Sequence, residues 1–305
     1  MNRFQQRRLD DVDEQANSIS AWQQAYLQLS DGPFHGQLDE ICSGQVQLFH
    51  EYTSLATWQQ CQPWRTAIWF GLPSDPEVVG LHYAGRPMSG QPLLICPAGQ
   101  DFDLRTPGDF GIFGLVVDQA WLGEVAARHG LPCQLPAAPA ALPLSGQAYW
   151  HLGHHLRLLL AQPPDRQHAP LEIQTEPLLV SLLRLLASTR LPSLPAPTRH
   201  WAVMERARAL IADEQHGVHD VQTLARRLYL TRRTLQNLTQ ETLGITPLAL
   251  IHAIRLQALR RDLRDPAQAA IPLAELASRH DFWHAGQLAQ SYRRHFGEGL
   301  RPGRR

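Results

Sequence analysis

The pattern of apolar and polar positions changes along the chain. Residues 17–30, NSISAWQQAYLQLS, read as a short helix that ends at Gly32 and Pro33. From 34 to 118, short apolar or alternating runs such as QVQLFHEY, TAIWFGLP and FGIFGLVV are separated by Gly, Pro and Asp. This pattern predicts several short β-strands. Short strands without long helices favour a small barrel or sandwich.

The rest of the chain has helical spacing. Residues 147–161 and 171–190 are predicted to be two helices, separated by the helix-breaking stretch QPPDRQHAP. The second helix carries a broad leucine face, which favours a dimer contact because such a face is otherwise exposed. Three prolines in LPSLPAPT predict a linker. The expected organisation is a β-rich domain at 1–146, a helical linker or dimerisation element at 147–190, a proline-rich linker at 191–198 and an all-α domain at 199–305.

An imperfect repeat lies in the all-α domain. LARRLYLTRRTLQNLTQETLG begins at Leu224, and LASRHDFWHAGQLAQSYRRHFG begins at Leu276. In both copies a closing glycine follows a central leucine by nine positions, and the first half of the second copy is one residue longer. Each copy reads as a short helix, a tight turn and a longer helix. This is the layout of a helix-turn-helix, whose second helix enters the major groove of DNA.

The second longer helix shows why a DNA partner is expected. Leu288, Tyr292 and Phe296 are four residues apart and therefore share one stripe of the helix. Glutamine and arginine fill the other positions of FWHAGQLAQSYRRHFG, which contains no carboxylate. In the first copy, Thr231 is the expected N-cap of the longer helix and Gly244 its left-handed end. Thr246 and Pro247 predict the start of a long helix between the copies.

Charge supports this division of the chain. The formal net charge is zero, yet residues 1–198 hold 11 arginines against 18 carboxylates and residues 199–305 hold 17 against 10. The charge is therefore −7 in the first part and +7 in the second. A basic C-terminal part indicates a nucleic-acid partner for that part alone.

Residues 200–300 resemble the AraC-type bacterial transcription regulators, which carry two helix-turn-helix units joined by a long helix. The resemblance is carried by Leu224-Ala225, Thr231, Leu235, Gly244-Ile245-Thr246-Pro247, Arg255-Leu256, Ala258, Phe282, Leu288, Tyr292 and Phe296-Gly297. Three positions depart from the family pattern. Asp281 stands where the family usually has glycine, and Thr239 stands where an aromatic residue usually packs. Leu300 stands where proline usually follows Phe-Gly, and Pro302 comes two residues later.

The N-terminal part is similar to the regulators of ethanolamine-utilisation operons within the same family. The similar stretches are SAWQQAYLQLSDGPFHGQL, VQLFHE, WFGLP and TPGDFGIFGLVV. This resemblance implies an effector-sensing domain and an activator, and some members of that branch answer to ethanolamine and adenosylcobalamin. PLLICPAGQDFDL also resembles the β-turn of cupin-like sensor domains. It lacks the histidine cluster of metal-binding cupins, so we expect no bound metal. The sequence assigns no cofactor, and adenosylcobalamin enters only as an effector.

Candidate DNA-contacting residues are the polar ones on the two longer helices. Arginine, glutamine and asparagine form bidentate hydrogen bonds with base edges, whereas other arginines contact only phosphate. The candidates on the first helix are Arg232, Arg233, Gln236, Asn237 and Gln240, and those on the second are His284, Gly286, Gln287, Gln290, Arg293 and Arg294. Arg293 and Arg294 are expected to contact phosphate.

Candidate effector contacts are Glu51, Trp69 and Asp101, because an ammonium ligand favours an aromatic face and a carboxylate. The alternative is that the tryptophans only form the core. The three histidines of HLGHH at 151–155 have ligand spacing, but no neighbouring carboxylate or cysteine completes a metal site. Four cysteines without a zinc pattern indicate reduced thiols in the cytoplasm, and no signal peptide or membrane span is expected.

The leading interpretation is a sequence-specific transcription regulator, not an enzyme, with an operator DNA, a small-molecule effector, RNA polymerase and a second copy of itself as partners. One alternative is a cupin-type enzyme with an accessory nucleic-acid-binding domain. No nucleophile–base pair or phosphate loop supports it. Another is a constitutive architectural DNA-binding protein, which the long acidic N-terminal part disfavours.

Overall fold

The computed structural model describes residues 3–161, 169–189, 194, 197–213 and 218–300. The chain forms two compact units. The first comprises Met1–Tyr26, His35–Ser54 and Gln59–Ala196, and the second comprises Leu27–Phe34, Leu55–Trp58 and Pro197–Arg305. The second unit therefore includes two short segments from the N-terminal part of the sequence, in addition to the helical domain. Most of the predicted breaker and most of the predicted proline-rich linker lie outside the described residues.

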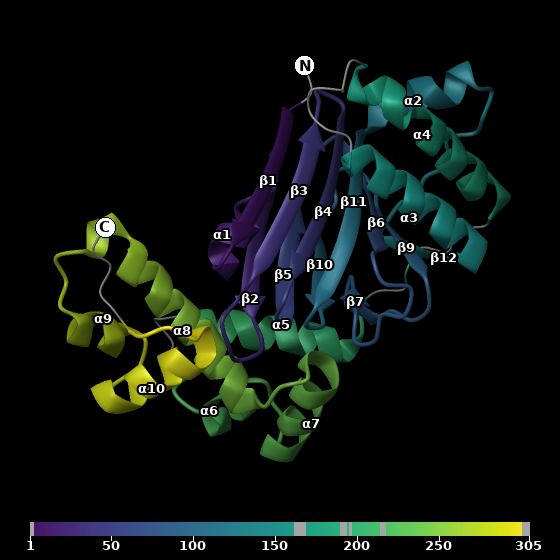
Figure 1. Cartoon of the computed structure of the whole chain (residues 1–305). Coiled ribbons are helices and arrows are strands. Elements are labelled where there is room, and N and C mark those ends of the chain that lie inside the picture. The colour runs from purple at the N-terminus through teal and green to yellow at the C-terminus, as the bar shows by residue number, and fades with distance from the viewer. Residues whose placement is uncertain (1–2, 162–168, 190–193, 195–196, 214–217, 301–305) are drawn as a thin grey trace. The chain divides into compact units, whose positions relative to one another are not determined.

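The first unit is built on two β-sheets (Figure 1). The larger, antiparallel sheet has the strand order β1 (Arg3–Leu9), β3 (Gly36–Cys42), β4 (Val46–Thr53), β11 (Phe110–Asp118), β6 (Ala67–Pro73), β9 (Pro92–Cys96) and β12 (Ala140–Pro143). The smaller sheet has the order β2 (Gln23–Gln28), β5 (Thr57–Gln62), β10 (Phe102–Thr106), β7 (His82–Tyr83) and β8 (Arg86–Pro87). This arrangement agrees with the predicted β-rich domain.

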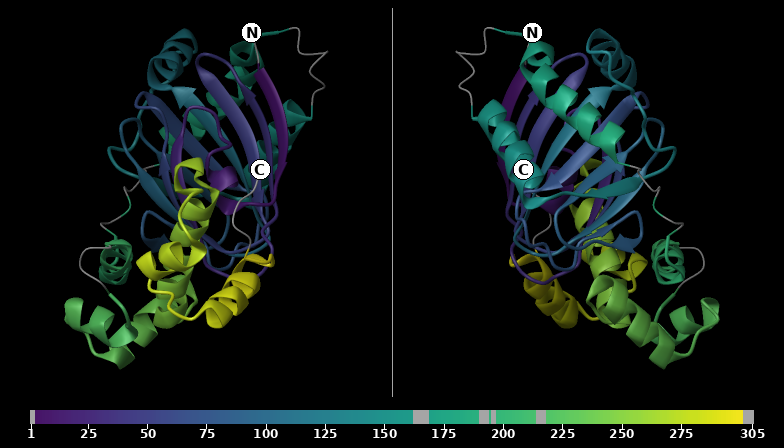
Figure 2. Two further views of the ribbon diagram at one scale, coloured as in Figure 1. Left: turned by 90° about the vertical axis from the view of Figure 1, so that its left-hand side faces the viewer. Right: turned by 90° about the vertical axis from the view of Figure 1, so that its right-hand side faces the viewer.

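The central strands β6 and β11 of the larger sheet are buried on both faces. One face packs against the smaller sheet through a core that includes Phe49, Trp69 and Phe102. The other face packs against α2 (Gln119–Arg128), α3 (Gly146–Leu160) and α4 (Leu171–Ser188), as Figures 1 and 2 show. Every residue of β6 is buried as a result. The run AIWFGLP is therefore apolar almost throughout, because neither of its faces meets water.

One helix predicted for this unit is absent, and one helix that the unit contains was not predicted. The helix predicted at 17–30 is absent: α1 spans Val12–Ala16, and the stretch that follows forms strand β2. Asp11 caps α1 with its carboxylate, and the polar run QQAYLQ becomes a strand because it pairs in the smaller sheet. Sheet pairing overrides a weak local preference. Helix α2, which follows β11 and is capped by Asp118, was not expected.

The leucine face that was predicted to form a dimer contact instead packs inside the first unit. Six of the seven leucines of α4 are buried within the unit's own core, and Leu185 is partly buried against it. They cover the larger sheet together with α2 and α3, so they are not available to a partner. This correction applies to the leucine face and leaves the predicted dimer itself untested.

The second unit consists of helices around two separate cores. Its elements are α5 (Arg199–Ala212), α6 (Val221–Arg227), α7 (Arg232–Leu243), α8 (Pro247–Arg264), a 3-10 turn at Pro266–Gln268, α9 (Leu273–Arg279) and α10 (Ala285–Phe296). The first core joins α5, α6, α7 and the first half of α8, and includes Leu27 and Trp58. The second joins the other half of α8 to α9 and α10. Helix α8 is thus shared by the two helix pairs α6–α7 and α9–α10.

Within the described part of the chain, no single helix is long and apolar enough to cross a membrane. Helices α7 and α8 meet the length and composition criteria only when taken together, and they are bent by 63° with respect to each other.

Candidate nucleic-acid interface

Helix α7 begins and ends as the sequence predicts. The Thr231 hydroxyl accepts a hydrogen bond from the Thr234 amide at 3.1 Å, and Gly244 closes the helix with a φ of 75°. Thr239, at the position where an aromatic was expected, is completely buried, and its hydroxyl donates to the Leu235 carbonyl at 3.0 Å. A back-bonded threonine can be buried without leaving its hydroxyl unsatisfied.

The outer side of α7 is polar and open. Its apolar residues Leu235 and Leu238 are buried in the first core. All of the predicted DNA contacts on this helix are exposed, namely Arg232, Arg233, Gln236, Asn237 and Gln240. The helix therefore presents two arginines, two glutamines and an asparagine on a face that can approach base edges.

Helix α10 confirms the stripe expected from the sequence. Leu288, Tyr292 and Phe296 are between 2 and 4% exposed and form the second core with α8 and α9. The opposite side carries only polar or small residues. The predicted contacts on it are all exposed, namely His284, Gly286, Gln287, Gln290, Arg293 and Arg294. The apolar stripe thus fixes the helix in place and leaves the glutamines and arginines facing outwards.

Sequence reasoning missed Trp283, which immediately precedes this polar face. Its side chain is 72% exposed, although tryptophan is usually well buried. It occupies the position that makes the second copy of the repeat one residue longer than the first. The extra residue was the sequence signal that the two copies differ just before their longer helices begin.

The turn between α9 and α10 accommodates Asp281 in place of the usual glycine. Its backbone has a φ of 63°, and Tyr229 in the turn between α6 and α7 has a φ of 58°. Aspartate is one of the few residues besides glycine that adopts this conformation readily. In each turn the next residue donates back into the first helix of its pair, Leu230 to the Ala225 carbonyl and Phe282 to the Ala277 carbonyl. The turn geometry therefore survives the departure from the family pattern.

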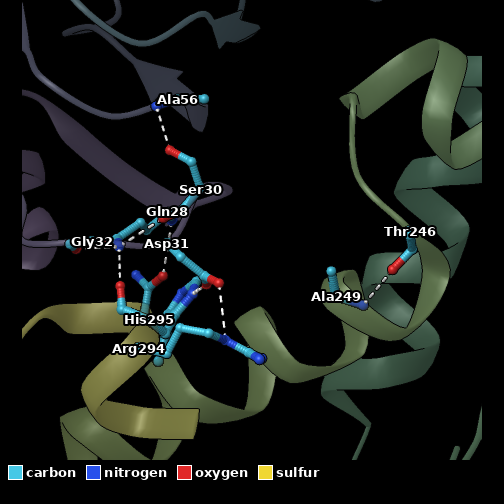
Figure 3. A network of polar contacts seen from close by, with 10 residues as sticks. Gln28, Ser30, Asp31, Gly32, Ala56, Thr246, Ala249, Arg294 and His295 are labelled. Atoms are coloured by element: carbon cyan, nitrogen blue, oxygen red, sulfur yellow. Dashed lines mark hydrogen bonds and ion pairs between the residues drawn. The ribbon is translucent and has the colours of Figure 1, made fainter.

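The C-terminal end of α10 is held by the segment Leu27–Phe34, which belongs to the same unit (Figure 3). Asp31 lies 3.0 Å from Nε of Arg294 and 2.9 Å from Nδ1 of His295. The side-chain amide of Gln28 and the backbone amide of Gly32 both donate hydrogen bonds to the His295 carbonyl. Burial lowers the pKa of His295, and Asp31 acts in the opposite direction. One of the predicted phosphate contacts, Arg294, is therefore already paired with a carboxylate.

The structure does not bring the three candidate effector residues together. Asp101 is exposed and accepts a hydrogen bond from Gln62 at 3.0 Å, whereas Glu51 and Trp69 are buried between the two sheets. In the sheet register Glu51 lies opposite Ile112, and Trp69 lies opposite Val116. These positions differ by about 13 Å along the strand. The two residues therefore do not lie opposite each other in the sheet.

Glu51 is enclosed by neutral partners. It accepts hydrogen bonds from the Gln15 amide at 2.8 Å and the Tyr26 hydroxyl at 2.9 Å. Burial raises the pKa of Glu51, and the two hydrogen bonds oppose this shift. The resulting pKa is about 7. Near neutral pH this carboxyl group therefore lies close to its own titration point.

A second buried carboxylate, that of Glu40, is linked by hydrogen bonds to a tryptophan. Glu40 is completely buried, and it accepts hydrogen bonds from the Ser20 hydroxyl and the Gln47 amide. Trp22 in turn donates to Gln47 at 2.8 Å, and its ring lies 6.4 Å from that of Trp69. Trp69 also stacks on Phe102 at 4.3 Å. Glu40, which sequence analysis did not select, is thus linked through Gln47 to Trp22, whose ring lies beside that of Trp69.

Other candidate chemistry remains dispersed. His151, His154 and His155 are exposed on α3, and no group of three metal-binding side chains occurs among the described residues. Cys42, Cys61, Cys96 and Cys133 are all free thiols. Burial raises the pKa of Cys96 to about 12, which keeps that thiol protonated.

Comparison with known proteins bears on the helical unit. Residues 224–302 match the family model described as a helix-turn-helix domain. The chain is 33% identical over 78 residues to the XylDLEGF operon transcriptional activator of Pseudomonas putida, and 36% identical over 77 residues to the "Probable thc operon regulatory protein" of Rhodococcus erythropolis. These alignments cover 26% and 25% of this chain and 24% and 23% of the relatives. The chain thus spans about a quarter of the length of the curated relatives it matches.

Solved structures of similar chains have low superposition scores. The AraC-like transcriptional activator CuxR shares 18% identity with a TM-score of 0.39, and ToxT from Vibrio cholerae shares 9% with a TM-score of 0.29. The alignments cover 92% of this chain in both cases, and 99% and 96% of those chains. The family match identifies residues 224–302 as a helix-turn-helix domain and agrees with the AraC-type resemblance of this segment.

Proposed function

We propose that the protein is a sequence-specific transcription regulator that reads DNA with two helix-turn-helix units in one chain. The observation that carries this proposal is the pair of polar faces on α7 and α10. Each faces outwards from its own core, and each follows a left-handed turn. The two faces differ in sequence, so they fit two different DNA sub-sites about one helical turn apart rather than a palindrome.

Selection from random duplexes with the full chain tests this proposal. The expected result is a bipartite, asymmetric site bound with a steep dependence on salt. Gln236→Ala should lose preference at one base pair within one half of that site. The matched control is Gln222→Ala, on α6, which removes the same amide outside the two polar faces. The full chain is required because Leu27, Leu29 and Trp58 are part of the first helical core.

We further propose that the β-sheet unit senses a small amine such as ethanolamine and that the protein activates a metabolic operon. Three observations support this: the negative charge of residues 1–198, two buried carboxylates with neutral partners, and the aromatic group around Trp69. The Trp69 indole nitrogen is buried without a hydrogen-bond partner in the described part of the chain. A cation beside Glu40 would gain carboxylate pairing and contact with aromatic faces.

Calorimetry on the full chain with ethanolamine tests the effector, with and without adenosylcobalamin. Glu40→Gln should abolish the heat of binding, whereas Glu51→Gln should retain it, because Glu40 is linked through Gln47 to Trp22, whereas Glu51 accepts its hydrogen bonds from Gln15 and Tyr26. The absence of heat at millimolar amine with folded protein would remove the amine from the proposal without affecting the DNA reader. The proposal that adenosylcobalamin is a second effector rests on the family resemblance alone. Contact with RNA polymerase and formation of a homodimer are also parts of the proposal.

A further inference from the structure

The two helix pairs are built on separate hydrophobic cores, so their relative orientation depends on the groups that join them. Helix α8 contributes Leu250, Ile251 and Ile254 to the first core, and Leu256 onwards to the second. Arg255 lies at the boundary between these two sets. A side chain anchored at this boundary can hold one helix pair against the other.

Asp281 makes such a connection from the turn of the second pair. One carboxylate oxygen lies 2.6 Å from Nη2 of Arg255, and the other lies 2.9 Å from Nδ1 of His219. The same Arg255 nitrogen also donates to the Val218 carbonyl. Val218 and His219 immediately precede α6, the first helix of the first pair. A single carboxylate thus connects the first pair, the middle of the shared helix and the turn of the second pair.

The turn itself does not require this carboxylate. Glycine adopts a left-handed φ without steric cost, and the two backbone hydrogen bonds of the turn do not involve the Asp281 side chain. Tyr229, the counterpart of Asp281 in the first pair, has the same backbone conformation with an 85% exposed side chain. The side chain of Asp281 is therefore available for the connection between the helix pairs.

The connection lies largely out of solvent. The side chains of Arg255 and Asp281 are 11% and 20% exposed, and that of His219 is 66% exposed. Burial lowers the pKa of Arg255, and the carboxylate of Asp281 opposes this shift. An ion pair of low exposure is less screened by salt than a surface pair. The Arg255 contact is therefore the stronger half of the connection and the His219 contact the weaker.

We propose that Asp281 is a positioning residue that fixes the angle between α7 and α10 and thereby sets the spacing of the two DNA sub-sites. This inference rests on the proposed bipartite DNA reading. Inserting one base pair between the sub-sites moves the second by about 3.4 Å and rotates it by roughly 35°. A firmly joined pair of helices rejects such a site, and a loosely joined pair accepts it.

The experiment compares binding of the full chain to its selected DNA site and to versions with one base pair added or removed between the sub-sites. Asp281→Gly retains the left-handed turn and removes the carboxylate. His219→Ala removes only the exposed partner, so it provides a second variant if Asp281→Gly does not fold. Tyr229→Gly is the matched control, because it makes the same backbone change in the other turn.

Asp281→Gly is expected to reduce discrimination against the altered spacings by at least about fivefold, the lower end of typical coupling between sites. His219→Ala should cause a smaller reduction in the same direction, and Tyr229→Gly should leave the discrimination within twofold of the wild type. An unchanged discrimination in Asp281→Gly, or an equal loss of affinity for every spacing, would overturn the inference. Failure of the wild type to select any bipartite site would instead refute the proposed function.

Discussion

Asp31 and Arg294 form an ion pair of 3.0 Å at the C-terminal end of α10 (Figure 3). Their side chains are 50% and 64% exposed, so the pair is open to water and to competing anions. A DNA phosphate offers Arg294 the same kind of oxygen acceptor. The carboxylate of Asp31 therefore competes with a DNA phosphate for Arg294.

Asp31→Asn is therefore expected to raise affinity for DNA by about two- to fivefold at low salt, the range of an exposed ion pair. The measurement is an equilibrium titration of the selected duplex. Asp10→Asn is the control, because Asp10 is an equally charged partner in an exposed pair with His35. If both variants strengthen binding equally, the gain reflects net charge and not the release of Arg294.

Base reading and phosphate contact should separate in two further variants. Gln236→Ala should cost roughly 1–3 kcal/mol on the selected site and relax preference at one base pair. Arg293→Ala should weaken binding to selected and random DNA alike and reduce the salt slope by about one. Competition assays at several salt concentrations distinguish the two patterns. Equal losses on both kinds of DNA for Gln236→Ala would exclude it as a base contact.

The N-cap of α8 provides a stability test. The Thr246 hydroxyl accepts from the Ala249 amide at 3.1 Å (Figure 3), which satisfies one of the unpaired amides at the helix start. Thr246→Ala should destabilise the helical unit by about 1 kcal/mol, and Thr246→Ser should restore most of the loss. Urea unfolding measures the change in the free energy of unfolding. Amide hydrogen exchange shows whether the first turn of α8 is the part that is destabilised. Unchanged exchange there would contradict the role of the cap.

The buried carboxyl group of Glu51 predicts a dependence of stability on pH. Its folded pKa of about 7 lies above the ordinary 4.5, so the folded state binds more protons between these values. Stability should therefore fall as the pH rises through this window, by at most about 3 kcal/mol, and level off above it. Glu51→Gln should remove this fall, whereas the exposed control Glu124→Gln should not. The free energy of unfolding of the wild type and of both variants, measured from pH 4 to 8, tests this prediction.

Much of the helical unit could be predicted because its determinants are local. Capping threonines, closing glycines and the stripe of Leu288, Tyr292 and Phe296 act within a few residues along the chain. The strand at QQAYLQ could not be predicted, because its pairing partner is distant in sequence. The same holds for Glu40, whose link through Gln47 to Trp22 forms only through the folding of several strands. Asp281 was visible as a departure from the family, but its contacts with His219 and Arg255 required the structure.

The central claim is that one chain reads two different DNA sub-sites with α7 and α10. Hydroxyl-radical footprinting of the full chain on its selected duplex tests this claim most directly, with Gln236→Ala and Gln290→Ala as paired variants. The claim predicts two protected segments about one helical turn apart. Gln236→Ala should weaken protection mainly in one segment and Gln290→Ala mainly in the other. A single protected segment, or a symmetric palindrome on which both variants affect the same bases, would contradict it.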